Sequence, residues 1–128
     1  MTGIAQKTII FNDKGEILAI RRSGTDPHRP LTWDLPGGEL EIGEDPKEGM
    51  LREIKEEVAI DVKNLQLFDI DGRFNAKNEY RVGICYKAEA ASTDVILSYE
   101  HDQFEWITKE EFLKRESSAK LMKYISQL

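Results

Sequence analysis

The chain has 128 residues, the length of one ordinary domain, and its 40% apolar and 33% charged residues are typical of a globular protein. The formal net charge of −6 argues against a general binder of nucleic-acid backbones. We therefore expect a single domain over residues 1–128 and no nucleic-acid polymer as partner.

The first stretch predicts a β-hairpin. Residues 4–11 are rich in β-branched and aromatic side chains, which favour a strand, and residues 12–15 have the composition of a turn. Residues 16–22 then alternate in the manner of a second strand.

A polar loop over residues 21–30 holds three arginines and is the main basic cluster of the chain. We expect a clamp for substrate phosphates here, with Arg22 and Arg29 as its candidate residues. An ordinary solvated loop is the alternative.

Residues 31–38 lead from this loop into a glycine turn. Trp33 and Leu35 are expected to face the core or a pocket, and a pocket would make Trp33 a substrate contact. The successive Gly37 and Gly38 let the backbone approach a ligand closely, so that backbone carbonyls could reach a metal ion. Gly38 is a further candidate for substrate binding.

An amphipathic helix follows. Asp45 suits the N-cap and Pro46 the first helical position, which predicts a helix that runs to about Val58. At about 100° per residue, one face is apolar and the other carries Arg52, Glu53, Glu56 and Glu57. Like charges one turn apart destabilise a helix, and a bound cation would reverse that penalty. Hard divalent ions prefer such oxygen ligands; a solvated acidic surface is the alternative.

The spacing around this helix resembles a known signature. From Gly38 the chain reads Gly, five residues, Glu44, seven residues, Arg52-Glu53-Ile54, one residue, Glu56-Glu57, two residues and Ile60. This resembles the signature box of the Nudix hydrolases, the MutT-like superfamily, over residues 38–60.

One position departs from that signature, because the last glycine of the family is Ala59 here. A glycine would let the chain leave the helix in a left-handed conformation, which costs an alanine roughly 1 kcal/mol. We therefore expect Ala59 to keep a negative φ and the turn to shift toward residues 60–61.

Two further strands are predicted over residues 62–74 and 80–88, with a turn over 75–78 between them. Cys85 is expected to be a buried thiol, and a single cysteine fits a reducing compartment. No stretch approaches the length of a membrane span and no apolar leader begins the chain, so we expect a cytoplasmic protein without a membrane partner.

The last part of the chain predicts a strand over residues 104–107, a helix over 108–114 and an amphipathic helix over 117–127. Glu100 precedes that strand in a Glu-His pair. Many Nudix proteins carry such a pair before a tryptophan, which implies that Glu100 faces the acidic helix as a metal ligand or general base. A solvated loop glutamate is the alternative.

The resemblance implies an α/β (α+β) fold in which a mixed β-sheet is sandwiched between α-helices. It also implies metal-dependent hydrolysis of a diphosphate bond in a nucleoside diphosphate linked to another group. Mg²⁺ or Mn²⁺ would be held by Glu53, Glu56, Glu57, Glu100 and the carbonyl of Gly37. Arg52 is expected to orient carboxylates through a bidentate pair. The general base is left open among Glu53, Glu56 and Glu100.

Three functions compete. The first is an active pyrophosphohydrolase, the second a Nudix-fold nucleotide-binding or regulatory module without catalysis, and the third an unrelated protein whose acidic helix binds a structural cation. The intact set of glutamates favours the first, because a pure binder has no need of them. The expected substrate is a (d)NTP that yields a nucleoside monophosphate, with a dinucleotide or nucleotide sugar as runner-up. The oligomeric state, a homodimer included, is left open.

Overall fold

The computed structural model describes residues 3–128 and contains seven strands and three helices in that range. In chain order these are β1 (Gly3–Phe11), β2 (Ile17–Arg22), β3 (Trp33–Asp34), β4 (Gly37–Glu39), α1 (Pro46–Val58), β5 (Val62–Phe74), β6 (Tyr80–Ala90), β7 (His101–Ile107), α2 (Lys109–Leu113) and α3 (Ala119–Ser126).

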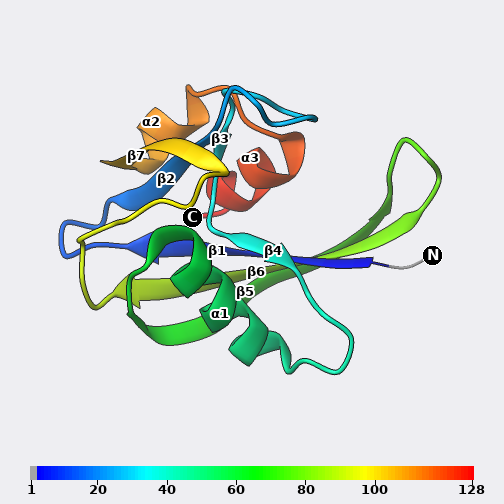
Figure 1. The fold of residues 1–128 in the computed structure, drawn as a ribbon, viewed down its shortest axis with the longest axis horizontal. Helices are drawn as coiled ribbons and strands as arrows, with labels where there is room; N and C mark the ends of the chain where they lie inside the picture. The colour runs from blue at the N-terminus through cyan, green and yellow to red at the C-terminus, as the bar shows by residue number, and fades with distance from the viewer. Residues whose placement is uncertain (1–2) are drawn as a thin grey trace.

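The strands form one mixed sheet with the order β3-β2-β1-β6-β5, in which β4 also pairs with β1 and β7 with β2. The pairing of β1 with β6 is parallel and the other strand pairs are antiparallel. The predicted hairpin is present, but β1 and β2 pair only next to their turn, at Phe11 and Ile17. Beyond that point the two strands diverge, and each carries its own neighbours (Figure 1).

Helices cover both faces of the sheet, as predicted for a mixed sheet between helices (Figure 1). One core cluster joins α1 to the sheet and contains Met50, Ile54, Val58, Ile10, Leu18 and Ile20. The other joins α2 and α3 to the opposite face and contains Phe112, Leu121, Tyr124, Ile125, Ile9, Ile17 and Cys85. Each fully buried aliphatic or aromatic side chain contributes about 1.5–3 kcal/mol. Successive side chains of β1 and β2 point to opposite faces of the sheet and therefore belong alternately to the two core clusters.

Most expected elements are confirmed with small changes at their ends. Asp45 caps α1, where its carboxylate accepts the N–H of Glu48 at 3.2 Å, and Thr108 begins α2 with a complete capping box. β6 continues two residues further than expected, to Ala90. β7 begins at His101 and not at Phe104, because its first residues pair with the far end of β2.

The prediction for the end of α1 is wrong. Ala59 has φ 58° and ψ 29°, in the left-handed region, and its N–H donates to the carbonyl oxygens of Ile54 and Lys55. Val58 and Ile60 on either side are both buried. The chain has to reverse at this one residue to bring both side chains into the core, and a left-handed residue with a Cβ costs about 1 kcal/mol.

Cys85 is buried in β6, as predicted, and burial raises the pKa of its thiol to about 12. Between residues 3 and 128, no helix has the length and apolar character needed to cross a membrane.

Candidate active site

A cavity of about 610 Å³ lies over the charged face of α1, between β4 and the start of β7. We call it the carboxylate cavity, because its walls include Glu53, Glu56, Glu57 and Glu100. Four other residues singled out from the sequence line it as well: Arg22, Gly37, Gly38 and Arg52. Glutamates from α1 and from the segment before β7 therefore meet in one place.

Glu57 ties the helix to the glycine turn. Its Oε1 accepts the backbone N–H of Gly37 at 2.7 Å, and only 6% of the residue is exposed. Burial raises the pKa of Glu57 to about 7, although Lys7 and the Gly37 N–H act in the opposite direction. A neighbouring cation would favour its ionised form.

Gly38 makes room for Glu53. A Cβ on Gly38 would lie 2.6 Å from the carboxyl carbon of Glu53, so a side chain there would displace that carboxylate. Burial raises the pKa of Glu53, and the charges of Glu56 and Glu100 add to that rise while Arg52 opposes it. The carboxylate of Glu53 is thus held against the backbone of β4, within electrostatic reach of Glu100.

Arg52 gathers the acidic side chains around it. Its Nε and one terminal nitrogen donate to the two carboxylate oxygens of Glu44 at 2.6 and 3.0 Å, and the other terminal nitrogen reaches Glu56 at 3.1 Å and Glu53 at 3.2 Å. Glu44 can reach Arg52 because Gly49 has no side chain; a Cβ there would lie 2.6 Å from a Glu44 oxygen. The hydrogen bonds with Glu44 raise the pKa of Arg52 above its ordinary value.

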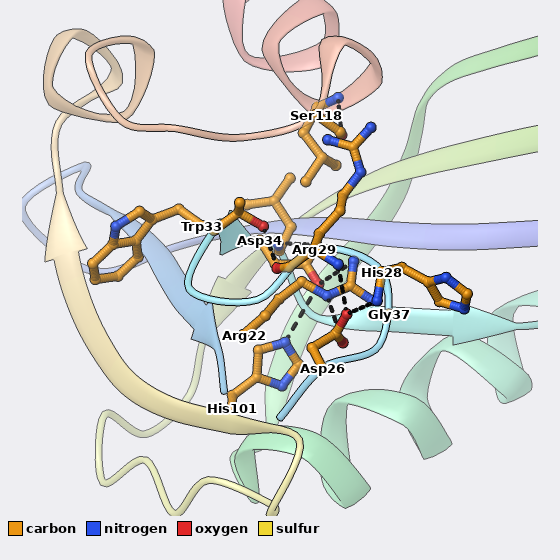
Figure 2. Close-up of polar contacts among 12 residues, drawn as sticks. Arg22, Asp26, His28, Arg29, Trp33, Asp34, Gly37, His101 and Ser118 are labelled. Atoms are coloured by element: carbon orange, nitrogen blue, oxygen red, sulfur yellow. Dashed lines mark hydrogen bonds and ion pairs between the residues drawn. The ribbon is translucent and has the colours of Figure 1, made fainter. Parts of the chain in front are cut away.

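A buried network that sequence reasoning missed lies beside the carboxylate cavity. Asp34 is 3% exposed, and one of its oxygens binds Lys7 Nζ at 2.9 Å. Its other oxygen lies 3.3 Å from His101 Nε2 (Figure 2). Burial alone would raise the pKa of Asp34, but Lys7, His101 and Arg22 together lower it below its ordinary value. The available signal was Lys7 itself, a lysine inside an otherwise uncharged strand.

The register of β2 against β7 shifts between Arg21 and Arg22, where Arg22 pairs with His101. Such a bulge redirects a side chain next to a site. Arg22 binds Asp26 at 3.1 Å and lies 4.0 Å from Asp34, so the arginine loop is anchored at the cavity (Figure 2).

A second cavity of about 350 Å³ adjoins the first. We call it the basic recess; it shares Lys7, Arg22, Asp34, Arg81 and Lys120 with the carboxylate cavity. The remaining two predicted substrate residues, Arg29 and Trp33, line the recess and not the carboxylate cavity. The structure thus distributes the predicted substrate residues over two adjoining spaces.

The carboxylate cavity suits a hard divalent cation by its chemistry. Its acidic donors are all carboxylate oxygens, and burial and like charge raise the pKa of two of them. Across residues 3–128, no three acidic, histidine or cysteine side chains converge as a ready metal cage. Glu53 and Glu56 instead bind Arg52.

A mixed sheet between helices, with a glycine turn set against a glutamate-rich helix, defines a class of hydrolases that act on phosphoric anhydrides. The model of the NUDIX domain matches residues 1–127, so the chain belongs to the Nudix hydrolase family. Nudix hydrolases generally use divalent metal ions.

Three relatives illustrate the similarity. A MutT-like protein of Streptomyces ambofaciens is 27% identical over 120 residues, which cover 94% of this chain and 73% of that protein. The 8-oxo-dGTP diphosphatase of Escherichia coli K12 is 39% identical over 61 residues, 48% of this chain and 46% of the enzyme, so the match spans about half of either protein. The crystal structure of a MutT protein from Methanosarcina mazei superposes with a TM-score of 0.78 at 30% identity and covers 98% of this chain and 91% of that one.

Proposed function

We propose that this chain is a metal-dependent pyrophosphohydrolase that cleaves a (d)NTP to a nucleoside monophosphate and pyrophosphate. One observation carries the proposal: Glu53, Glu56, Glu57 and Glu100 line the same cavity as the cations Lys7, Arg22, Arg81 and Lys120. Carboxylates suit a divalent ion and the cations suit phosphate oxygens, so the cavity has both halves of a site for a metal-bound polyphosphate.

The metal would be held by Glu53, Glu56, Glu57, Glu100 and the Gly37 carbonyl, and when bound it supplies charge neutralisation on the polyphosphate and an acidified water. Within the protein, the Gly37–Glu57 hydrogen bond fixes one of these carboxylates before any ligand arrives. Arg52 fixes Glu44 and Glu56 in the same way.

Lys7 and Arg22 are the proposed phosphate contacts, because both line the cavity and both form ion pairs with Asp34, at 2.9 and 4.0 Å. Asp34 therefore acts as a positioning residue, and the nearly buried ion pair with Lys7 limits the mobility of that lysine.

Glu100 is the proposed general base. It approaches from outside α1, and its segment is fixed by the N–H of Ser23, which donates to the Glu100 carbonyl at 3.0 Å. A base that does not belong to the helix can reach a water that attacks phosphorus in line from a direction that the carboxylates of α1 do not cover.

A nucleotide panel with Mg²⁺, with products separated by anion-exchange chromatography, tests the proposal. It should include the common NTPs and dNTPs, 8-oxo-dGTP, a dinucleotide and a nucleotide sugar. We expect pyrophosphate and a nucleoside monophosphate from at least one triphosphate. Binding of Mg²⁺ and nucleotide without turnover of any member would contradict the proposal and favour a non-catalytic binding module.

A further inference from the structure

The basic recess concentrates positive charge on an acidic protein. Six of the 18 lysines and arginines line this one space, although the chain has a formal net charge of −6. They are Lys7, Arg22, Arg29, Arg73, Arg81 and Lys120. The one carboxylate among the lining residues is Asp34, which is 3% exposed and already bound to Lys7 and His101.

The protein itself compensates only part of this charge. Arg73, Arg22 and Arg81 have carboxylate partners in Asp71, Asp26 and Glu39. Arg29 and Lys120 have no carboxylate within 4.0 Å in the part of the chain from residue 3 to residue 128. Burial, together with the charges of Lys7 and Arg73, lowers the pKa of Lys120 below its ordinary value. The recess therefore has unmet affinity for an anion.

The lining is poorly suited to a stacked base. Trp33 is the one aromatic side chain among the recess residues, and the guanidinium of Arg115 already occupies one face of its ring, at 4.5 Å from the centroid. Anion recognition by guanidinium and ammonium groups is the chemistry that these walls offer.

The cations also extend beyond the region that a scissile diphosphate needs. Lys7, Arg22, Arg81 and Lys120 line both cavities, whereas Arg29 and Arg73 line the recess alone. A diphosphate in the carboxylate cavity would use the shared set and leave Arg29 and Arg73 without a ligand.

We propose that the substrate carries a second phosphate on its ribose, and that the basic recess binds this group while the diphosphate lies in the carboxylate cavity. The proposal rests on the proposed function and narrows its substrate class to nucleotides with a 2′- or 3′-phosphate. The sugar is attached directly to the diphosphate, so its hydroxyls are the nearest positions for a further phosphate. The small volume of the recess and the acidic net charge favour a mononucleotide over a nucleic-acid chain.

Measurements of nucleotide binding test this inference without any catalytic turnover. Isothermal titration calorimetry of the metal-free protein with adenosine 3′,5′-bisphosphate, adenosine 2′,5′-bisphosphate and AMP compares ligands that differ by one phosphate. We expect at least one bisphosphate to bind about tenfold or more tightly than AMP, the scale of one charge-assisted hydrogen bond. Equal affinity for all three would overturn the proposal.

Variants on the β5–β6 hairpin assign the effect to the recess. Arg73→Gln should reduce the bisphosphate-to-AMP affinity ratio by about tenfold, and Arg73→Lys should keep most of it because the charge remains. Lys77→Gln removes one charge from an exposed residue of the same hairpin, outside both cavities, and should leave the ratio unchanged. Equal effects of Arg73→Gln and Lys77→Gln would overturn the assignment.

Turnover separates this inference from the proposed function. GTP, its derivative with one added phosphate at the ribose position (2′ or 3′) whose bisphosphate binds more tightly, and a 5′-triphosphorylated dinucleotide form a matched series, and we expect the highest kcat/KM for the phosphorylated derivative. Equal rates for GTP and that derivative would overturn the inference and leave the proposed function intact. A higher kcat/KM for the dinucleotide would contradict a mononucleotide substrate and indicate an RNA 5′ end as the substrate. If none of the three compounds and no triphosphate of the nucleotide panel is cleaved, while the bisphosphates still bind selectively, the proposed function is overturned and the recess remains a phosphate site.

Discussion

Glu57 in the last turn of α1 accepts a hydrogen bond from the backbone N–H of Gly37, with 2.7 Å between nitrogen and oxygen. The two residues are 20 positions apart, and this bond fixes the orientation of a carboxylate that is almost fully buried. The hydrogen bond therefore links α1 directly to the glycine turn.

Replacement of Glu57 or Glu53 by glutamine should lower kcat by at least ~10²-fold, because the amide cannot supply the charge on which the site depends. Folding should survive, since the amide oxygen introduced by Glu57→Gln can still accept the Gly37 N–H and like-charge repulsion is reduced. Steady-state kinetics and thermal melts measure the two effects. Glu48→Gln, an exposed change in the first turn of α1, is the control. Near-normal turnover of either variant would remove that glutamate from the catalytic site.

Turnover should require a divalent ion. Excess EDTA should abolish activity and Mg²⁺ or Mn²⁺ should restore it, because the acidic donors of the carboxylate cavity are oxygens suited to such ions. Product formation measured before and after each addition is the test. Full activity in chelator would exclude the proposed mechanism.

The stabilisation by Mg²⁺ should increase with pH. Burial raises the pKa of Glu57 from 4.5 to about 7, so the stability that this group contributes is fully present below about pH 4.5 and is lost as the pH rises through 7. A bound cation favours the ionised carboxylate, so the Mg²⁺-induced rise in Tm should be larger at pH 8 than at pH 5.5. Differential scanning fluorimetry of wild type and Glu57→Gln provides the comparison. If the Mg²⁺-induced rise in Tm depends on pH equally in both proteins, groups other than Glu57 cause that dependence.

Glu100→Gln should reduce kcat more than it raises KM, because a general base acts on the attacking water and not on substrate affinity. Glu105→Gln is the matched control: Glu105 lies in β7 and pairs with Arg115 at 2.7 Å, outside the carboxylate cavity. Equal kinetics for the two variants would return the role of base to a glutamate of α1.

Ala59→Gly should stabilise the protein modestly. A left-handed alanine costs about 1 kcal/mol, and the greater freedom of glycine in the unfolded chain offsets part of that relief. We expect a gain below about 1 kcal/mol from urea unfolding, whereas Ala59→Val should destabilise because a β-branched residue resists φ 58° more strongly. A loss of stability in the glycine variant would show that the alanine methyl makes a packing contribution larger than its strain.

The sequence predicted the parts of the fold that depend on local order. Asp45 and Pro46 mark the start of α1, and helical periodicity places the glutamates on one face. Neighbouring side chains of β2 divide between the two core clusters, as strand alternation requires. The box over residues 38–60 identified the family through short-range spacing alone.

Long-range pairing decides the rest. Asp34 and His101 lie 67 residues apart and meet only because β2 pairs with both β3 and β7. Lys120 joins Lys7 in the basic recess through the packing of α3, which no pattern within α3 indicates. Ala59 failed as a prediction because burial of its two neighbours outweighed the preference of the residue itself.

The divergence of β1 and β2 has a mechanical consequence. Lys7, Gly37 and Arg81 belong to the strands assembled on β1, whereas Arg22, Asp34 and His101 belong to those assembled on β2. The two groups are joined beside the hairpin turn, at the Phe11–Ile17 pair, and again at the site itself, where Lys7 Nζ binds Asp34 at 2.9 Å. The Lys7–Asp34 ion pair therefore connects the two groups of strands as well as positioning a proposed phosphate contact. A substitution of either partner would remove a charge from the site and also loosen the junction between the two groups.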